Sequence, residues 1–138
     1  MPATFSLQVV TPDHTVYSGE IVSLVAPGVE GYVGVLAHHA PMLVGLAPGL
    51  LELTAPTGER LVYAITGGFL QVAANKAIVL ADAAETPEEI DVRRAREALE
   101  RAQARLQQAQ VDIDVDRARA ALMRALNRLR VAERFGRR

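Results

Sequence analysis

The amino-acid sequence predicts an α+β protein, in which a small antiparallel β-sandwich or flattened barrel is followed by an antiparallel two-helix hairpin. Three observations carry this prediction. Short apolar runs separated by turn residues fill the first part of the chain, and apolar residues recur at steps of three and four in the second. The charge also changes sign: residues 1–85 hold two basic and seven acidic residues, whereas residues 86–138 hold thirteen arginines and nine acidic residues. We therefore predict two domains, 1–85 and 86–138.

The first domain is predicted to be all-β because its apolar runs are short and end at turn residues. Residues 4–10 alternate between apolar and polar side chains before a turn at 11–13. Further runs lie at residues 21–26, 50–54, 61–66, 69–72 and 77–80. Residues 31–51 contain no Asp, Glu, Lys or Arg over the length of a membrane span, but their four glycines, two prolines and two histidines favour short buried strands and turns.

The second domain is predicted to begin its first helix at residues 86–89, where a threonine, a proline and two glutamates form the pattern of a capping box. Two stripes at alternating steps of four and three predict the packed faces of two helices. Their members are Ala95, Leu99, Ala102, Leu106 and Ala109, then Ala118, Leu122, Ala125, Leu129 and Ala132. The second helix is expected to stop before Gly136, and narrow stripes rich in alanine favour a close hairpin with its turn at 109–112.

The two helical segments are copies of one another, since residues 90–109 match residues 113–132 at thirteen of twenty positions. The arginines beside each stripe repeat as well. They are Arg94, Arg101 and Arg105 in the first copy and Arg117, Arg124 and Arg128 in the second. Planar guanidinium groups bind phosphate in bidentate fashion, which favours a polyanion ligand. Such rows are also typical of a solvated helix face with intrahelical ion pairs, so the spacing leaves both interpretations open.

Several classes of function find no support in the residues. The chain has no cysteine and one lysine, and its adjacent His38 and His39 would point to opposite faces of a strand. We therefore expect no catalytic residue, no metal site and no required cofactor. The helical domain has one aromatic residue, Phe135, so we expect no nucleic-acid partner. No basic residue precedes Arg60, so we expect no export signal, and we expect no transmembrane segment.

Four motifs in register resemble the epsilon subunits of F-type ATP synthases. They lie at residues 9–13, 31–41, 66–72 and 81–85, and the resemblance extends over residues 5–134. It implies a non-catalytic rotor subunit on the cytoplasmic face of the bacterial cell membrane, attached peripherally. Its sandwich would bind the gamma subunit and the c-ring, and its helices would either fold as a hairpin or extend into the catalytic alpha/beta head and block ATP hydrolysis.

The resemblance also implies functional residues. Contacts of the rotor with gamma and the c-ring would fall on Glu30, Gly31, His39 and Pro41. Some bacterial members bind ATP as a regulatory ligand on the folded hairpin through a motif that appears here from Ile90 to Ala95. The ATP contacts would fall on Glu85, Ile90, Asp91, Arg94, Ala95, Arg101, Arg124 and Arg128.

The chain repeats the motif at 113–118, where Gln108 replaces the upstream glutamate, so the site is assigned to the first copy and Arg117 has a less defined role. Two alternatives stay open: a rotor subunit without nucleotide sensing, and an unrelated helical-hairpin module that binds another protein.

Overall fold

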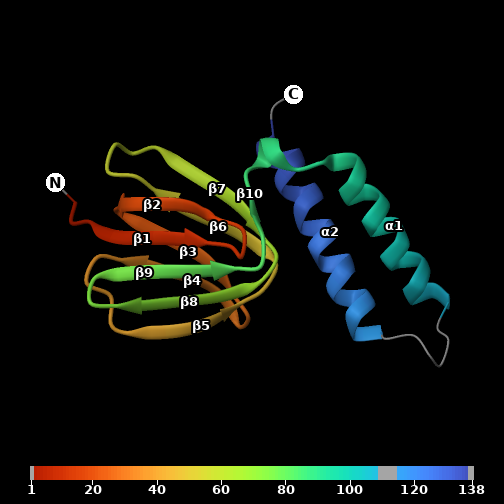
Figure 1. Cartoon of the computed structure of the whole chain (residues 1–138), viewed down its shortest axis with the longest axis horizontal. Helices are drawn as coiled ribbons and strands as arrows, with labels where there is room; N and C mark the ends of the chain where they lie inside the picture. The colour runs from red at the N-terminus through yellow and green to blue at the C-terminus, as the bar shows by residue number, and fades with distance from the viewer. Residues whose placement is uncertain (1, 109–114, 137–138) are drawn as a thin grey trace. The chain divides into compact units, whose positions relative to one another are not determined.

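The computed structural model describes residues 2–108 and 115–136 (Figure 1). The chain divides into two compact units, Met1–Glu85 and Thr86–Arg138. The first is a nearly closed sandwich of β-strands and the second contains two helices, so the predicted fold class is confirmed. The hairpin turn predicted at 109–112 lies outside the described residues.

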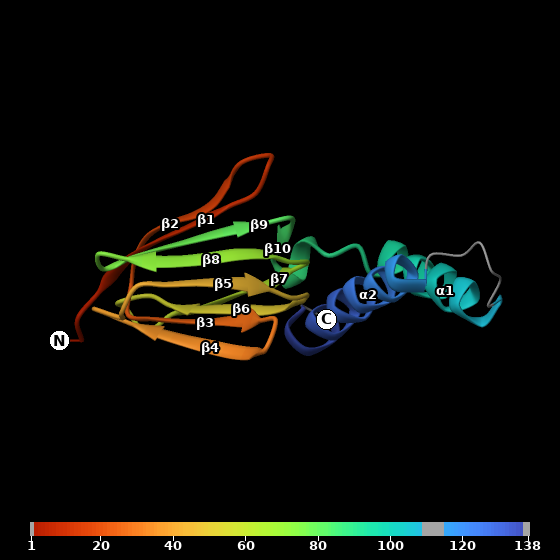
Figure 2. The same ribbon diagram turned by 90° about the horizontal axis from the view of Figure 1, so that it is seen from below.

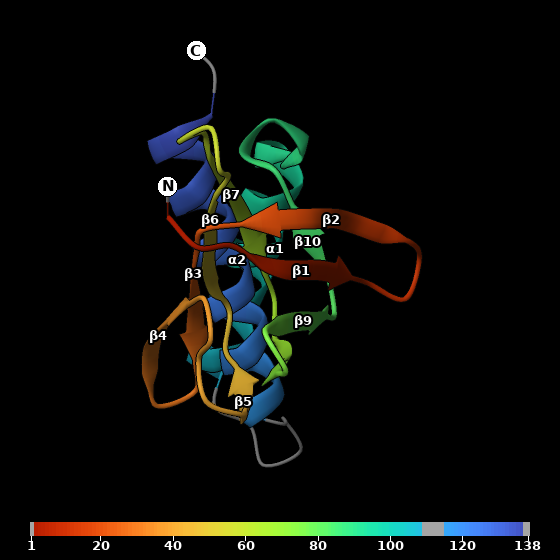
Figure 3. The ribbon, with the colours of Figure 1, turned by 90° about the vertical axis from the view of Figure 1, so that its left-hand side faces the viewer.

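Ten strands form the first unit within the described residues. They are β1 (Phe5–Val10), β2 (Thr15–Ile21), β3 (Ser23–Gly28), β4 (Gly31–Leu36), β5 (Met42–Leu46), β6 (Gly49–Thr54), β7 (Arg60–Ile65), β8 (Gly68–Ala73), β9 (Lys76–Ala81) and β10 (Ala84–Glu85). Neighbouring strands follow the order β10-β7-β6-β3-β5-β8-β9-β1-β2, and β4 pairs with β3. The β1–β2 and β3–β4 hairpins lie at opposite edges of the sandwich (Figures 2 and 3).

The strand pairing departs from the antiparallel prediction at one place, since β1 and β9 run parallel, with Leu7 opposite Ala77. Alternation of apolar and polar residues reports which face of a strand is buried and carries no information on strand direction. A second feature is the short pairing of β3 with β5, which the register limits to Gly28 and Leu46 and which divides the strand order into two sheets. The two sheets therefore face each other over one core.

That core consists of the inward side chains of the alternating strands. Its largest fully buried members are Phe5, Leu7, Val9, Ile21, Leu24, Val35, Leu51, Leu53, Ile65, Leu70 and Val79. The uncharged segment 31–51 does form strands, as predicted, but β4 is largely exposed and buries only Val35. The expectation that these strands are buried was wrong for β4 because it is an edge strand that pairs with β3 alone.

The second unit contains a short 3₁₀ turn, η1 (Pro87–Glu89), and the helices α1 (Val92–Gln108) and α2 (Val115–Phe135). The Glu89 carboxylate accepts hydrogen bonds from the backbone N–H and the hydroxyl of Thr86, as the capping pattern predicts. However, this cap opens η1 and not α1, so the predicted start of the first helix was wrong. The extended backbone of Ile90 ends the 3₁₀ turn. Gly136 directly follows α2, as expected.

Candidate functional site

Alanine side chains form the contact between α1 and α2. Ala95 and Ala102 on the first helix and Ala118 and Ala125 on the second are all buried. The leucines of the predicted stripes are only half-buried. Because a methyl group occupies little space, the two helix backbones can approach closely, and long side chains at the border of this seam extend beside it.

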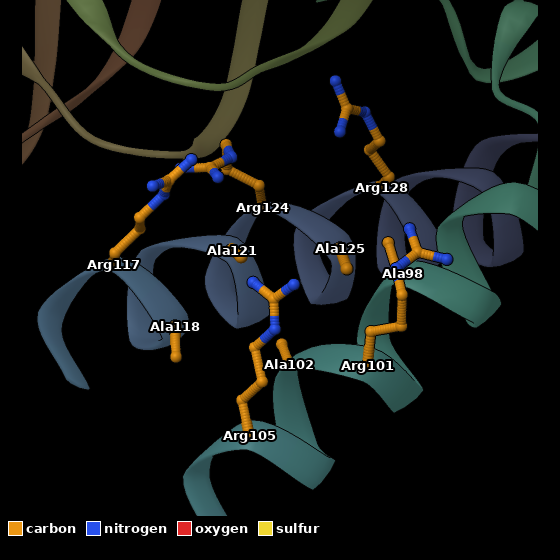
Figure 4. Close-up of a pocket in the computed structure, with 10 residues that line it drawn as sticks. All are labelled: Ala98, Arg101, Ala102, Arg105, Arg117, Ala118, Ala121, Arg124, Ala125 and Arg128. Atoms are coloured by element: carbon orange, nitrogen blue, oxygen red, sulfur yellow. The ribbon is translucent and has the colours of Figure 1, made fainter. Parts of the chain in front are cut away.

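Beside the seam lies a cavity of about 290 Å³ that both helices line (Figure 4). Its lining residues are Ala98, Arg101, Ala102, Arg105, Arg117, Ala118, Ala121, Arg124, Ala125 and Arg128. In Figure 4, Arg101 and Arg105 reach from α1 toward α2, and Arg117 and Arg124 extend toward one another along α2. Guanidinium groups and alanine methyl groups therefore line the cavity together.

The internal repeat explains how these arginines come to one place. Arg101 and Arg105 of α1 correspond to Arg124 and Arg128 of α2 at an offset of 23 residues, the offset that also relates the first residues of the helices, Val92 and Val115. Two equivalent helices therefore present equivalent arginine pairs to the shared cavity. Among residues 2–108 and 115–136, the side chains that line the cavity include five arginines and no Asp or Glu, a composition suited to anions.

The structure gathers some of the predicted ATP contacts and leaves others apart. Arg101, Arg124 and Arg128 line the cavity, whereas Arg94 is exposed and does not belong to the lining. Glu85 belongs to the first unit, where it lies in β10 opposite Ala64 of β7. The cavity thus brings together three of the arginines predicted to contact ATP, one from α1 and two from α2.

The remaining motif residues have structural contacts of their own. The backbone N–H of Arg94 donates to Asp91 Oδ1 at 3.0 Å, so the Asp91 side chain caps the first turn of α1. Ile90, which precedes the helix, is 7% exposed. Ala95, which belongs to the alanine seam, is 4% exposed. Three of the residues expected to contact ATP therefore also start, anchor and pack the first helix.

The prediction of the site left out Arg105 and Arg117, which both line the cavity. The internal repeat held a signal for both. Arg105 is the equivalent of Arg128, which the prediction included, and Arg117 is the equivalent of Arg94. The repeat therefore indicated Arg105 correctly, whereas Arg117 lines the cavity although its equivalent Arg94 does not.

The residues predicted for the rotor interface lie in two groups. Glu30 and Gly31 lie at the turn that begins β4, and His39 and Pro41 follow its end at Leu36. Strand β4 lies between the groups and extends roughly 17 Å from Gly31 to Leu36, five steps of about 3.3 Å. Near the second group, the His38 backbone N–H donates to Asn75 Oδ1 at 2.8 Å, which ties this loop to the β8–β9 turn.

The sequence did not single out an apolar surface on the sandwich. Leu43 on β5, Phe69 on β8 and Leu80 on β9 are 73%, 57% and 52% exposed. Phe69 lies opposite Leu80 in the strand register and opposite Gly45, two residues from Leu43. Large apolar side chains that gather on a surface typically mark a contact with another protein.

Two general properties bear on function. Among residues 2–108 and 115–136, no helix is long and apolar enough to cross a membrane. Over the same described residues, no group of three or more His, Asp or Glu side chains is placed to hold a metal ion.

Comparisons with known proteins match both units of the chain to one protein family. The model of the ATP synthase delta/epsilon chain β-sandwich domain matches residues 4–87, and the model of its long α-helix domain matches residues 88–133. An ATP synthase epsilon chain from Carboxydothermus hydrogenoformans is 50% identical over 106 residues, which are 77% of this chain and 78% of the relative. One from Syntrophomonas wolfei is 47% identical over 105 residues, 76% of this chain and 77% of the relative.

Two solved structures of mitochondrial ATP synthases also contain chains that match this one. A chain of the Euglena gracilis mitochondrial ATP synthase, from an assembly of OSCP, F1 and c-ring, matches with a TM-score of 0.81 and 29% identity. The match covers 92% of this chain and 80% of that one. A chain of the Tetrahymena thermophila mitochondrial ATP synthase central stalk and c-ring shares the fold, with a TM-score of 0.60 at 15% identity over 99% of this chain and 98% of that one.

Proposed function

The chain belongs to the ATP synthase delta/epsilon family, and we propose that this epsilon subunit is a rotor component whose C-terminal hairpin senses ATP and restrains ATP hydrolysis. It is a non-catalytic subunit of the central stalk, so it acts on ATP synthesis and hydrolysis through other subunits. The family match makes the alternative of an unrelated helical-hairpin module wrong. The observation that carries the sensing proposal is the cavity lined by five arginines from both helices.

The partners that we propose for the sandwich are the gamma subunit and the c-ring, at the cytoplasmic face of the cell membrane. The structural relatives come from assemblies that contain the c-ring, which supports this placement. The exposed surface of Leu43, Phe69 and Leu80 offers apolar area for such a contact. The hairpin is proposed to contact the alpha/beta head when it opens, with its arginines meeting acidic side chains there.

ATP favours the folded hairpin in this proposal because its phosphates bind both helices at once. Arg101 and Arg105 come from α1, whereas Arg117, Arg124 and Arg128 come from α2. Separating the helices divides this set and removes the site. A ligand that binds only the folded form stabilises it by about 2.7 kcal/mol at a concentration of 100 Kd. ATP would therefore shift the population away from the extended, inhibitory form.

The weak packing of the alanine seam allows ligand binding to shift the population between the two forms. Apolar burial stabilises by about 25 cal/mol per Å², and alanine buries little area. Helices joined through Ala102 and Ala125 gain less from packing than helices joined through leucines. A few kcal/mol of ligand binding is therefore large enough to decide between the two forms.

We assign the nucleoside part of ATP to the residues around the start of α1. Glu85 and Asp91 would orient the base, the ribose or a neighbouring arginine, and Arg94, which lies outside the cavity lining, would contact the nucleoside beside Asp91. Asp91 already accepts a hydrogen bond from the Arg94 backbone, so its carboxylate would bind the ligand through its remaining acceptor positions. ATP acts here as a regulatory ligand, and the subunit requires no cofactor.

The test compares Arg124→Ala with Arg130→Ala, because Arg130 lies on the same helix but outside the cavity lining. Calorimetric titration of the 138-residue chain is expected to show ATP affinity about 10- to 100-fold weaker for Arg124→Ala, the effect of losing charged hydrogen bonds. In the assembled complex, the same variant should hydrolyse less ATP at a fixed ATP concentration. Arg130→Ala should match the wild type in both measurements.

A rotor subunit without nucleotide sensing would give a different result. Such a subunit would co-purify with gamma, yet the isolated chain would release no heat on addition of ATP. Unchanged ATP affinity in Arg124→Ala would contradict the placement of the site, and no binding to the wild-type chain would contradict ATP sensing itself.

A further inference from the structure

We propose that the cavity between α1 and α2 recognises linked phosphate groups as such, so that inorganic polyphosphate binds there in competition with ATP. The inference rests on the proposed function because it concerns the same cavity. It goes further by naming the chemistry that the cavity selects: a chain of phosphates, whether free or attached to a nucleoside.

The lining of the cavity supports this chemistry. Within the described part of the chain, five arginines and five alanines line it. The adenine edge presents an amino donor beside ring-nitrogen acceptors, and neither an arginine nor an alanine side chain carries an acceptor for that amino group. Guanidinium groups instead form paired hydrogen bonds with phosphate oxygens. The cavity therefore supplies affinity for phosphate and little means of recognising adenine.

The size of the cavity points the same way. Its volume of about 290 Å³ is just below the roughly 300–1,000 Å³ that small-molecule pockets occupy. The residues assigned to the nucleoside, Asp91 and Arg94, lie outside the lining. Removing the nucleoside therefore leaves the contacts within the cavity unchanged.

The arrangement of the arginines suits a chain with equivalent ends. Arg101 and Arg105 are four residues apart on α1, and their repeat equivalents Arg124 and Arg128 are four apart on α2. Four residues advance a helix by about 6 Å. Each helix thus offers one such pair of cations along its length, and α2 adds Arg117. An inorganic polyphosphate presents the same group at each position, so it can bind both pairs in either direction.

The deciding measurement is a calorimetric titration of the full chain with sodium tripolyphosphate, ATP, AMP and citrate. The inference predicts that tripolyphosphate binds within about tenfold of ATP and competes with it, whereas AMP binds at least about 100-fold more weakly because it lacks linked phosphates. Citrate supplies three carboxylates without phosphate. If citrate binds as tightly as tripolyphosphate, the cavity is a general anion site and the inference is overturned.

The remaining outcomes separate this inference from the proposed function. If ATP binds and tripolyphosphate does not, the inference fails and ATP sensing stands. Binding of tripolyphosphate without ATP would support recognition of phosphate chains and overturn ATP sensing. If neither ligand binds, both proposals fail.

Variants locate the binding site. Arg105→Ala and Arg117→Ala remove lining residues from different helices, and Arg119→Ala is the matched control on α2 outside the lining. Each lining variant should weaken tripolyphosphate binding about 10-fold or more, whereas Arg119→Ala should leave it unchanged. Far-UV circular dichroism confirms that the helices are retained, and Arg117→Lys keeps the charge if Arg117→Ala does not fold. Equal weakening by Arg119→Ala would overturn the placement.

Discussion

The sandwich and the hairpin differ in the side chains that hold each together. The sandwich core contains large residues that are almost completely buried, such as Phe5, Leu24 and Leu51. The buried residues of α1 and α2 are four alanines and Val131. Since apolar burial contributes about 25 cal/mol per Å², the helix contact gains much less per residue. The comparison shows a sandwich held together by large buried side chains and a helix pair held together mainly by methyl groups.

The largest effect is expected from the sandwich core. Leu51 is 0% exposed, so Leu51→Ala should lower the free energy of unfolding by about 2–5 kcal/mol through lost burial and the cavity left behind. Urea denaturation followed by tyrosine fluorescence measures this, because all three tyrosines lie in residues 1–85. The control Leu43→Ala, at a position 73% exposed, should stay within about 0.5 kcal/mol of the wild type. An equal loss in the control would contradict the described core.

The second effect should be confined to the hairpin. Ala102 is 3% exposed, so Ala102→Leu should overpack the alanine seam and destabilise the helix pair by about 1–3 kcal/mol. Hydrogen exchange should become faster in α1 and α2 and stay unchanged in the sandwich strands. Ala104→Leu is the matched control because Ala104 is exposed on the same helix. Faster exchange in the strands as well would show that the two units are not independent in stability.

The third effect separates the capping role of Asp91 from its proposed role in binding ATP. Asp91→Ala removes the cap of α1 and should cost about 1 kcal/mol of hairpin stability, whereas Asp91→Asn keeps a side-chain oxygen and should retain most of the cap. Thermal melting followed by far-UV circular dichroism tests this difference. ATP titration of Asp91→Asn then measures how much the negative charge of Asp91 contributes to ATP affinity. If Asp91→Asn lost as much helix stability as Asp91→Ala, the result would contradict the capping role.

How far the sequence could predict the fold depended on what each pattern encodes. Steps of three and four residues identify a helix face, and the predicted alanines Ala95, Ala102, Ala118 and Ala125 are the buried ones. The start of the first helix was misplaced because the capping pattern at Thr86 and Glu89 encodes a local turn. The buried Ile90, whose backbone is extended, then interrupts the helix. That interruption depends on tertiary packing and lies outside any local pattern.

The residues that line the cavity were predictable from the sequence only in part. Arg101, Arg124 and Arg128 line the cavity as the family motif suggests, but Arg94 does not. A motif fixes positions along the chain, whereas the lining of a cavity depends on how two helices cross and which turns face each other. Arg94 lies in the first turn of α1, whereas the lining residues of α1 run from Ala98 to Arg105. The repeat relates Arg105 to Arg128, which both line the cavity, but it also relates Arg94 to Arg117, of which only Arg117 does.

The smallest effect concerns the arginines that face away from the cavity. Arg93 Nε lies 3.4 Å from Glu97 Oε1, and the two side chains are 91% and 53% exposed. Exposed pairs at this spacing contribute only about 0.3–0.5 kcal/mol, so Glu97→Gln should change hairpin stability by no more than that amount, and 0.5 M salt should remove the difference. Thermal melts of both proteins at low and high salt measure it. A larger, salt-resistant loss would mean that Glu97 has a role beyond a solvated ion pair.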